Sequence, residues 1–550
     1  MPEVRAYAQG TRPAFREGYT ASARGAPRRL APRVPDLAAV GAVGVPSRRI
    51  RSALEPSRGR MEPAAPAVVL PGHPVREHRA AEPESLGMKT GPAAQRLILW
   101  ITILASFVSF LDGSVINVAL PAIDREFGGG LATQQWVVDA YLITLGALIL
   151  LAGSLSDVLG RILILRIGLI GFGVTSLVCA FAPTAEVLIV GRGFQGAAAA
   201  LLVPSSLALI TANFSGPERA KAIGHWTAGT TVAFIAGPIL GGVLVDTVGW
   251  RSVFWINVLP IAVTLYLLAV LGMKDTRAQG VRIDYAGAVL CVLGLGGPVY
   301  ALIEQGNLGW GSPAIWVPFV VGVLCLAGFL WRQATAKQPL MPLSLFTVRN
   351  FGVGNIATTF IYAALSIGGL IVVLFLQQVA GFPATFAALA TLPISILNIA
   401  LSSWFGSLAG RFGPRWFMAL GPILGGAGYL LMVTTRLPVD YWTQLLPGIL
   451  LFGVGLSVTV APLTAAILGS VSEEQSGIGS AVNNAVARVA GLVGVAVLGL
   501  IVGPTLDLDG FHRVLLVTAL LLVVGGLVSA VGIRNPPVQE PADGGAAASR

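Results

Sequence analysis

Long apolar runs dominate this 550-residue chain and limit what it can fold into. Hydrophobic residues make up 55% of the chain and charged residues 11%, whereas a soluble domain usually carries about 25% charge. A helix needs roughly 20 apolar residues to cross a bilayer, and the runs are continuous, unlike the alternating strands of a β-barrel. We therefore predict an all-α polytopic membrane protein with fourteen transmembrane helices. The predicted spans are 97–120, 133–153, 162–182, 186–210, 222–245, 252–272, 285–304, 313–332, 352–378, 385–405, 416–434, 442–468, 481–502 and 513–533.

A near repeat divides these spans into two matching halves. Gly153–Arg161 reads GSLSDVLGR, and GSLAGRFGP begins at Gly406, 253 residues later (406 minus 153). The copies join spans 2 and 3 and spans 10 and 11, so they are eight spans apart instead of the six of a plain duplication. Coincidence of Gly-Ser-Leu at a turn is the alternative. The predicted order is an N-terminal six-helix bundle, two inserted helices, a C-terminal six-helix bundle and a cytoplasmic tail: 97–272, 285–332, 352–533 and 534–550.

The first 87 residues differ in composition from the rest. They are rich in Arg, Pro and Ala, with fourteen Arg, no Lys and eight acidic residues, and they contain no apolar stretch long enough to span. They lack the apolar core of a secretory signal, and an organelle transit peptide would be less acidic and less Pro-rich. We expect either a disordered extension or a start codon set upstream of the true first residue, Met88 or Met61, and we assign this segment no function.

Basic residues are unevenly divided between the two sets of connections. With the N-terminus inside, the cytoplasmic connections carry twelve basic residues and the opposite ones four. This asymmetry predicts that both termini lie in the cytoplasm, on the inner side of the plasma (inner) membrane. We therefore attribute the positive charge to membrane topology and not to nucleic-acid binding. The twelve are Arg161, Arg166, Arg219, Lys221, Lys274, Arg277, Arg282, Arg332, Lys337, Arg349, Arg411 and Arg415, and the four are Arg125, Arg251, Arg436 and Arg513.

Three ionisable residues fall within one predicted layer of the membrane. At about 1.5 Å per residue, Asp112 lies about 22 Å from the inner face, and Asp139 and Arg192 lie about 9 Å below the outer face. Charges inside a membrane are costly and usually functional. We predict a proton-coupling cluster in which Arg192 tunes a carboxylate of Asp112 or Asp139, with Gln195 one turn away. A structural ion pair that only fixes helix packing is the alternative.

Two other charges and one small-residue face are notable. Glu304 ends span 7 near the outer surface, and Arg488 lies near the cytoplasmic side of span 13, where its side chain can reach the interface. In span 5 a small residue recurs every fourth position, which predicts a smooth face for close helix packing. Pro238 favours a kink in this span, and a smooth, bent face suits a rocking interface. The recurring residues are Gly229, Ala233, Gly237 and Gly241.

Six motifs occur in order at the predicted spans. Together they resemble the major facilitator superfamily, and specifically the fourteen-span drug:proton antiporter family of the EmrB/QacA type, over roughly residues 97–533. The resemblance implies proton coupling by Asp112 and Arg192. It also implies a gating loop motif with Gly153, Asp157, Gly160 and Arg161, and an exporter motif with Gly237, Pro238, Gly241 and Gly242. The motifs are Phe110–Pro121, Gly153–Arg161, Leu188–Gly196, Gly237–Gly242, Trp250–Asn257 and Gly479–Asn484.

The chain departs from this pattern in places. Val158 and Ile162 stand where the loop motif usually has basic residues, which weakens the expected charge latch around Asp157. Ala233 stands where the span-5 motif usually has its first glycine, and it is still small enough for close packing. Spans 8 to 14 show no acidic residue well inside the membrane, which favours neutral or singly charged amphipathic substrates over strongly cationic ones.

These observations predict a proton-coupled exporter of hydrophobic or amphipathic small molecules, such as drugs or antibiotics, that is not an enzyme. A metabolite importer or symporter on the same fold is the alternative. We expect no direct use of ATP, because no Lys follows a glycine in a phosphate-cradling loop, and no haem cofactor or metal, because the four histidines include no pair at ligand spacing within a span. The predicted partners are the bilayer, protons and the substrate, bound to a monomer. Candidate substrate-lining residues are Trp136, Tyr141, Gln195, Tyr362, Gln377 and Asn398.

Overall fold

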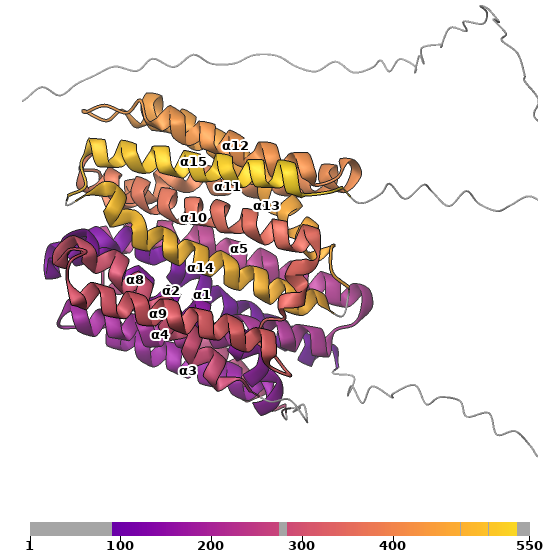
Figure 1. The fold of residues 1–550 in the computed structure, drawn as a ribbon. Coiled ribbons are helices and arrows are strands. Elements are labelled where there is room, and N and C mark those ends of the chain that lie inside the picture. Colours follow the sequence, from indigo (N-terminus) through magenta and orange to yellow (C-terminus); the bar gives the residue numbers. More distant parts are fainter. Residues whose placement is uncertain (1–90, 274, 276–282, 473–474, 504, 536–550) are drawn as a thin grey trace, which may run out of the picture. The chain divides into compact units, whose positions relative to one another are not determined.

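A computed structural model describes residues 91–273, 275, 283–472, 475–503 and 505–535, and the regular elements within them are all helices (Figure 1). The predicted all-α membrane fold is thereby confirmed. The N-terminal segment 1–87 and most of the tail 534–550 lie outside the described residues.

The helices of the first half lead into two inserted helices. The first half contains α1 (Pro92–Phe127), α2 (Gly130–Leu159), α3 (Arg161–Ala180), α4 (Ala185–Asn213), α5 (Gly216–Thr247), α6 (Ser252–Trp255) and α7 (Val258–Leu271). The inserted helices are α8 (Tyr285–Leu308) and α9 (Pro313–Thr335).

The second half begins after a short 3₁₀ turn at Leu343–Thr347 and contains a π-turn at Tyr441–Leu445. Its helices are α10 (Arg349–Gln378), α11 (Ala384–Phe412), α12 (Arg415–Met432), α13 (Leu446–Leu468), α14 (Ser476–Val502) and α15 (Leu508–Gly532).

Within the described residues, thirteen helical segments are long and apolar enough to cross a membrane, counting α6 with α7 and the π-turn with α13. The fourteenth predicted span corresponds to α12, which has 18 residues, begins at Arg415 and contains Gly421, Gly425, Gly426 and Gly428. These glycines lower its hydropathy, yet they let it pack closely: a Cβ at Gly428 would lie 2.6 Å from the carbonyl oxygen of Gly448 in α13. Small residues of this kind are what close helix contacts in membranes require.

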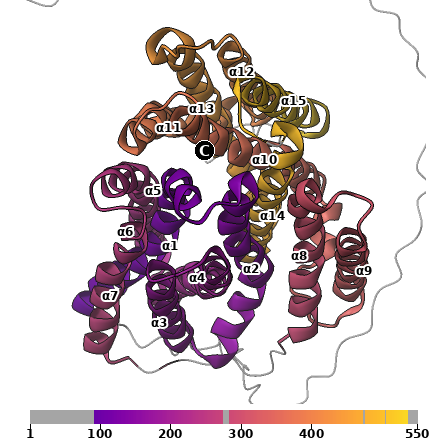
Figure 2. The same ribbon diagram turned by 90° about the vertical axis from the view of Figure 1, so that its left-hand side faces the viewer.

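Each half is held together by a few extensive helix pairs. In the first half α1 packs on α5, and α4 packs on both α2 and α3. In the second half α12 packs on α13 and α15, and α10 packs on α14 and α15. The halves meet through α2 with α14 and α5 with α11, as the view along the helices shows (Figure 2).

The inserted helices form a hairpin at the side of the molecule. α8 packs on α9 and reaches α2 and α14, one helix from each half (Figure 2). The Asp284 carboxylate caps α8 by accepting from the Gly287 amide at 2.9 Å and from Arg332 Nε at 2.6 Å. Burial alone would raise the pKa of the Asp284 carboxyl, but these bonds and one from Gln333 outweigh it and hold that pKa below its usual range.

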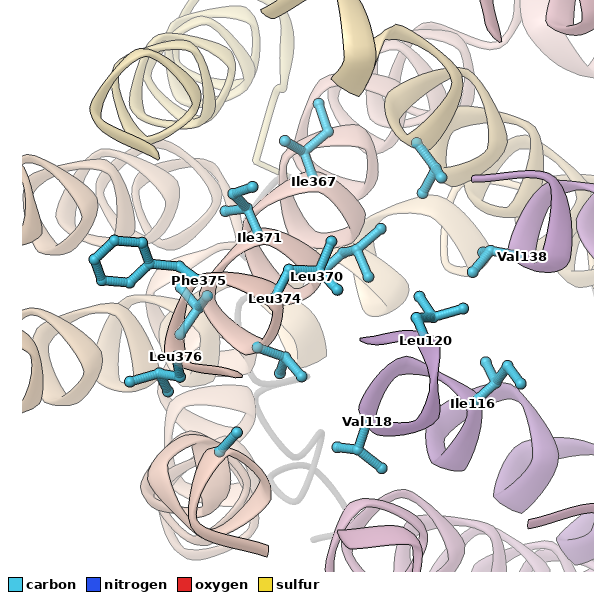
Figure 3. Close-up of a cluster of buried hydrophobic side chains, with 14 of the residues drawn as sticks. Ile116, Val118, Leu120, Val138, Ile367, Leu370, Ile371, Leu374, Phe375 and Leu376 are labelled. Atoms are coloured by element: carbon cyan, nitrogen blue, oxygen red, sulfur yellow. The ribbon is translucent and has the colours of Figure 1, made fainter. Parts of the chain in front are cut away.

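An apolar cluster joins the halves where α1 and α10 end and α2 and α11 begin, which we call the α1–α2 end. Ile116, Leu120 and Val138 belong to the same buried cluster as Leu370 and Phe375 of α10, on the other side of the boundary (Figure 3). Burial of this surface and the hydrogen bonds beside it close this end of the molecule.

Four sets of hydrogen bonds cross between the halves at the α1–α2 end. Gln377 donates to the Val118 carbonyl at 3.2 Å, and Gln378 donates to Gln134 at 3.2 Å. Gln135 donates to the carbonyl oxygens of Val495 and Ala496 at 2.6 and 3.0 Å. The carboxylate of Asp246 in α5 accepts from the backbone amides of Ala384 and Thr385 and from the Thr385 hydroxyl, at the start of α11.

Candidate functional site: a buried ion pair beside a cavity

Asp112 and Arg192 form an ion pair inside the first half. The distance from Arg192 Nη1 to Asp112 Oδ2 is 2.6 Å, and the two residues are 0% and 1% exposed, Arg192 being the more buried. Arg192 Nε also donates to the Val137 carbonyl of α2 at 3.0 Å, and its guanidinium lies 4.3 Å from the centre of the Tyr141 ring. One arginine of α4 therefore ties α1 and α2 together.

Glycines of α4 explain how a full-length arginine fits at this position. A Cβ at Gly196 would collide with the Tyr141 carbonyl of α2, and a Cβ at Gly191 would lie 2.9 Å from the Cys179 sulfur of α3. Close approach of α4 to both neighbours depends on these glycines. The motif Leu188–Gly196 thus places the guanidinium within reach of the α1 carboxylate.

Polar side chains complete the shell around Asp112. Its Oδ1 accepts from Gln195 Nε2 at 3.1 Å and from Asn257 Nδ2 at 2.9 Å. Gln195 also accepts from Arg192 at 2.7 Å and donates to the Ser176 hydroxyl at 2.9 Å. The carboxylate is thus bonded by one cation and two amides, the arrangement that a buried charge requires.

Asn257 and Ser176 are members of this shell that the sequence reasoning did not single out. Asn257 follows the short helix α6 and immediately precedes α7, so the break between the two helices presents its amide to Asp112. Its polarity at the start of an apolar run was the signal that could have identified it. Ser176 lies within the apolar α3, and a single hydroxyl there gave no comparable signal.

Asp139, the third predicted member, is separate from this pair. The residue is 0% exposed, and neither carboxylate oxygen has a hydrogen-bond partner within the described part of the chain. The predicted three-residue cluster is therefore an ion pair and a separate carboxyl group. The predicted depth in the membrane is similar for all three residues. The contact of α2 with Arg192 is made by the backbone carbonyl of Val137, two residues before Asp139, and the Asp139 side chain points away from the pair.

A cavity of about 140 Å³ lies between the halves next to the ion pair. Arg192 and Tyr141 form part of its wall from the first half, and Ser366 and Leu370 of α10 form part of its wall from the second. The remaining lining residues are Ser109, Phe110, Gly113, Ile116, Asn117, Val138, Leu142, Phe234, Arg488 and Val495. Helices of both halves therefore surround a space that the Asp112–Arg192 pair borders.

Of the six predicted substrate-lining residues, Tyr141 lines this cavity. The Trp136 indole donates to Glu304 of the inserted helix α8 at 2.6 Å, so it faces sideways, and Gln195 belongs to the Asp112 shell. Gln377 is bonded across the closed end. Tyr362 packs against apolar clusters of the second half, and Asn398 is half-buried on α11. These residues were chosen for their polarity or aromatic character, whereas the rotation of each helix decides where they point.

The predicted loop motif lies between α2 and α3. Gly160 has φ 114°, a backbone conformation that favours glycine, and it separates the two helices. Asp157 pairs with Arg161 at 3.2 Å on the partly exposed surface. Asp275, beyond α7, accepts from the amides of Ile162 and Leu163 at 2.7 and 2.9 Å and so caps the start of α3. Gly153 has open space around it.

The predicted exporter motif packs α5 on α1 beside the ion pair. A Cβ at Gly237 would collide with Ser114, and one at Gly241 would lie 2.5 Å from the Val115 side chain. Gly242 faces the other half, where a Cβ would lie 2.7 Å from the Cα of Thr385. With Pro238 inside the helix, α5 contacts both α1 near Asp112 and α11 across the boundary.

Comparison with known proteins places this fold in a family. The profile of the Major Facilitator Superfamily matches residues 102–495 and 376–549. The multidrug resistance protein Stp of Mycobacterium tuberculosis is 34% identical over 74% of this chain and 75% of its own length. The methylenomycin A resistance protein of Bacillus subtilis is 33% identical, over 74% and 87%. The tetracenomycin C resistance and export protein of Streptomyces glaucescens is 32% identical, over 73% and 76%.

Solved structures agree on the fold. A peptide transporter structure in complex with sulfate aligns with TM-score 0.60 at 13% identity, covering 78% of this chain and 93% of that one. A D-xylose-proton symporter aligns with TM-score 0.58 at 14% identity, covering 80% and 98%. The chain belongs to the Major Facilitator Superfamily. It is a multi-pass membrane protein embedded in a lipid bilayer, and the predicted family is confirmed.

Proposed function

We propose that this protein exports hydrophobic or amphipathic small molecules from the cell and uses the proton gradient as its energy source. The three relatives above are named as resistance or export proteins. The observation that carries the proposal is the Asp112–Arg192 ion pair, whose arginine lines a cavity between the halves. The protein acts as a monomer in the plasma membrane with both termini in the cytoplasm, and it needs neither a bound cofactor nor an enzymatic step.

The coupling step takes place at the Asp112 carboxylate. A proton on Asp112 removes the negative charge that faces Arg192, and the arginine then carries an uncompensated charge in a buried site. Because Arg192 also holds the Val137 carbonyl and lies over Tyr141, its movement alters both the α1–α2–α4 packing and the cavity wall. Proton uptake and substrate release are linked through this one side chain.

Alternating access is proposed to occur across the α5–α11 and α2–α14 contacts. With both termini in the cytoplasm, the hydrogen-bonded α1–α2 end faces outward, and the conformation described here is closed to the outside. Opening toward the outside breaks the bonds of Asp246 to the start of α11 and those of Gln135 to α14. The smooth glycine face of α5 lets this helix move against α1 and α11 without obstruction by side chains.

The energetics are sufficient for export. One charge crossing the membrane yields about 2.3 kcal/mol per 100 mV, and a tenfold concentration ratio costs about 1.4 kcal/mol. One proton per neutral substrate therefore supports a gradient of roughly fifty-fold per 100 mV.

The test uses inverted membrane vesicles, an imposed proton gradient and the neutral dye Nile red, with the wild type beside Asp112→Asn. Gradient-driven uptake by the wild type and its loss in the inserted variant are expected. Undiminished uptake by the variant would move the coupling role to Asp139. Movement of substrate only in the opposite direction would favour the importer alternative, and no gradient-dependent movement in either direction would contradict proton-driven transport.

A further inference from the structure

Arg488 of α14 is a second arginine in the cavity wall. It lines the cavity, is half-buried, and its guanidinium carbon lies 5.7 Å from the centre of the Phe110 ring on α1. From the sequence, either the cytoplasmic interface or the protein interior was open to this side chain, and the structure places it in the cavity wall. Residue depth was consistent with both placements, but the packing of α14 on α2, with Gly146 against Arg488, turns the side chain toward the other half.

The charges of the cavity do not balance. Of its lining residues, only Arg192 and Arg488 carry a formal charge. Arg192 is neutralised by Asp112, whereas within the described residues Arg488 has neither an ion pair nor a hydrogen bond, and its guanidinium lies near the Phe110 ring. A guanidinium has five N–H donors in a fork that matches planar or tetrahedral oxyanions. The cavity therefore presents unused donors and a net positive charge.

The remaining wall suits the apolar part of such a ligand. The rings of Phe110 and Phe234 lie 5.2 Å apart, and Tyr141 adds a third aromatic face. Ser109, Asn117 and Ser366 supply further hydrogen-bonding groups. A volume of about 140 Å³ is close to that of an engineered cavity that accepts benzene, so the space holds about one aromatic ring beside the arginine.

We propose that Arg488 binds an acidic group and that the substrates of this exporter include amphipathic organic anions beside neutral compounds. The ring of the substrate lies on Phe110 and Phe234, and its sulfonate or carboxylate receives the Arg488 guanidinium. This inference rests on the proposed function and names one class of its substrates. Its consequence is electrical: one proton entering in exchange for one monoanion leaving moves two positive charges inward. Both the pH gradient and the membrane potential then drive export.

The experiment compares two probes that differ in charge but share one aromatic ring and a sulfonyl group: benzenesulfonate and benzenesulfonamide. Equilibrium binding to the purified full chain in lipid nanodiscs is measured at neutral pH. The wild type is expected to bind the sulfonate at least ten-fold more tightly than the sulfonamide. Arg488→Gln is expected to bring this ratio close to one, and Arg488→Lys, which keeps the charge, is expected to keep part of it.

Arg411→Gln is the matched control, because Arg411 is exposed on α11 and does not line the cavity. It is expected to keep the wild-type ratio. The same ratio in Arg488→Gln as in the wild type, or a wild type without preference for the sulfonate, would overturn the proposal. Nile red transport by the wild type separates the two conclusions, since gradient-driven movement of this neutral dye supports the exporter whatever the sulfonate result.

Discussion

Asp112 and Asp139 are two buried carboxyl groups on neighbouring helices, and their surroundings are opposite. Asp112 accepts from Arg192, Gln195 and Asn257, and it is 1% exposed. Asp139 is 0% exposed, and within the described residues no donor reaches either of its oxygens. The role of a buried acid in this membrane protein therefore depends on the hydrogen-bond donors around its carboxylate and not on burial alone.

The position of Asp139 on α2 explains its isolation. One turn earlier, Gln135 is bonded to α14, and one turn later Ile143 belongs to an apolar cluster with Leu492 and Ala496 of α14. Residues one turn apart share a helix face, so Asp139 lies on the face between them. An ionised carboxyl group is costly in such surroundings. The comparison indicates that Asp112 is built to hold a charge and that Asp139 is not.

The largest effect is expected for Asp112→Leu. The substitution leaves Arg192 buried without its anion, and breaking a buried pair in this way costs about 3–5 kcal/mol. We expect a large drop in the free energy of unfolding, measured by denaturant titration of the purified protein in micelles. A stability equal to that of the wild type would show that the Asp112–Arg192 pair contributes little, and the contrast with Asp139 would fail.

Asp139→Leu is expected to act in the opposite direction. It removes an unpartnered polar group and extends the apolar cluster around Ile143 and Leu492, which is expected to raise the free energy of unfolding by about 1–3 kcal/mol. The same titration measures it, and Nile red transport by this variant adds a second readout. Retained transport would support Asp112 as the proton-coupling residue. Loss of coupled transport in a stably folded variant would instead assign the coupled proton to Asp139.

Sequence reasoning predicted the membrane fold, the spans and the presence of buried charges, because these follow from length, hydropathy and the cost of burying charge. It could not predict which charges meet. A residue count gives depth, but helix rotation is fixed by contacts such as Gly196 against Tyr141. For this reason the sequence left open whether Arg192 meets Asp112 or Asp139, and the structure pairs it with Asp112. Asn257 reaches the site through the break between α6 and α7, which the apolar run 252–272 conceals.

Ser176→Ala sharpens the comparison within the Asp112 shell. Ser176 accepts from Gln195 at 2.9 Å and from Asn257 at 3.4 Å, the two amides that donate to Asp112, so it acts as a positioning residue. Loss of one such bond is expected to cost about 0.5–1.5 kcal/mol. Gradient-driven transport is expected to fall less than in Asp112→Asn. A loss of transport as complete as in that variant would mean that the hydroxyl itself takes part in proton transfer.

The smallest effect is expected at Asp246, a third carboxylate with as many donors as Asp112 but in an exposed position. It accepts from the amides of Ala384 and Thr385 and from the Thr385 hydroxyl, and it is bonded to no cation. Asp246→Asn keeps one acceptor oxygen, so a loss of about 0.5–1 kcal/mol in unfolding free energy is expected.

Because the bonds of Asp246 join α5 to α11, the substitution is also expected to weaken the closure of the α1–α2 end. A pair of spin labels on the ends of α5 and α11 measures the change, and a larger separation is expected in Asp246→Asn than in the wild type. An unchanged distance distribution would assign the closure to the buried apolar cluster around Leu120 and Leu370, and hydrogen bonds at the exposed end would then contribute little beside it.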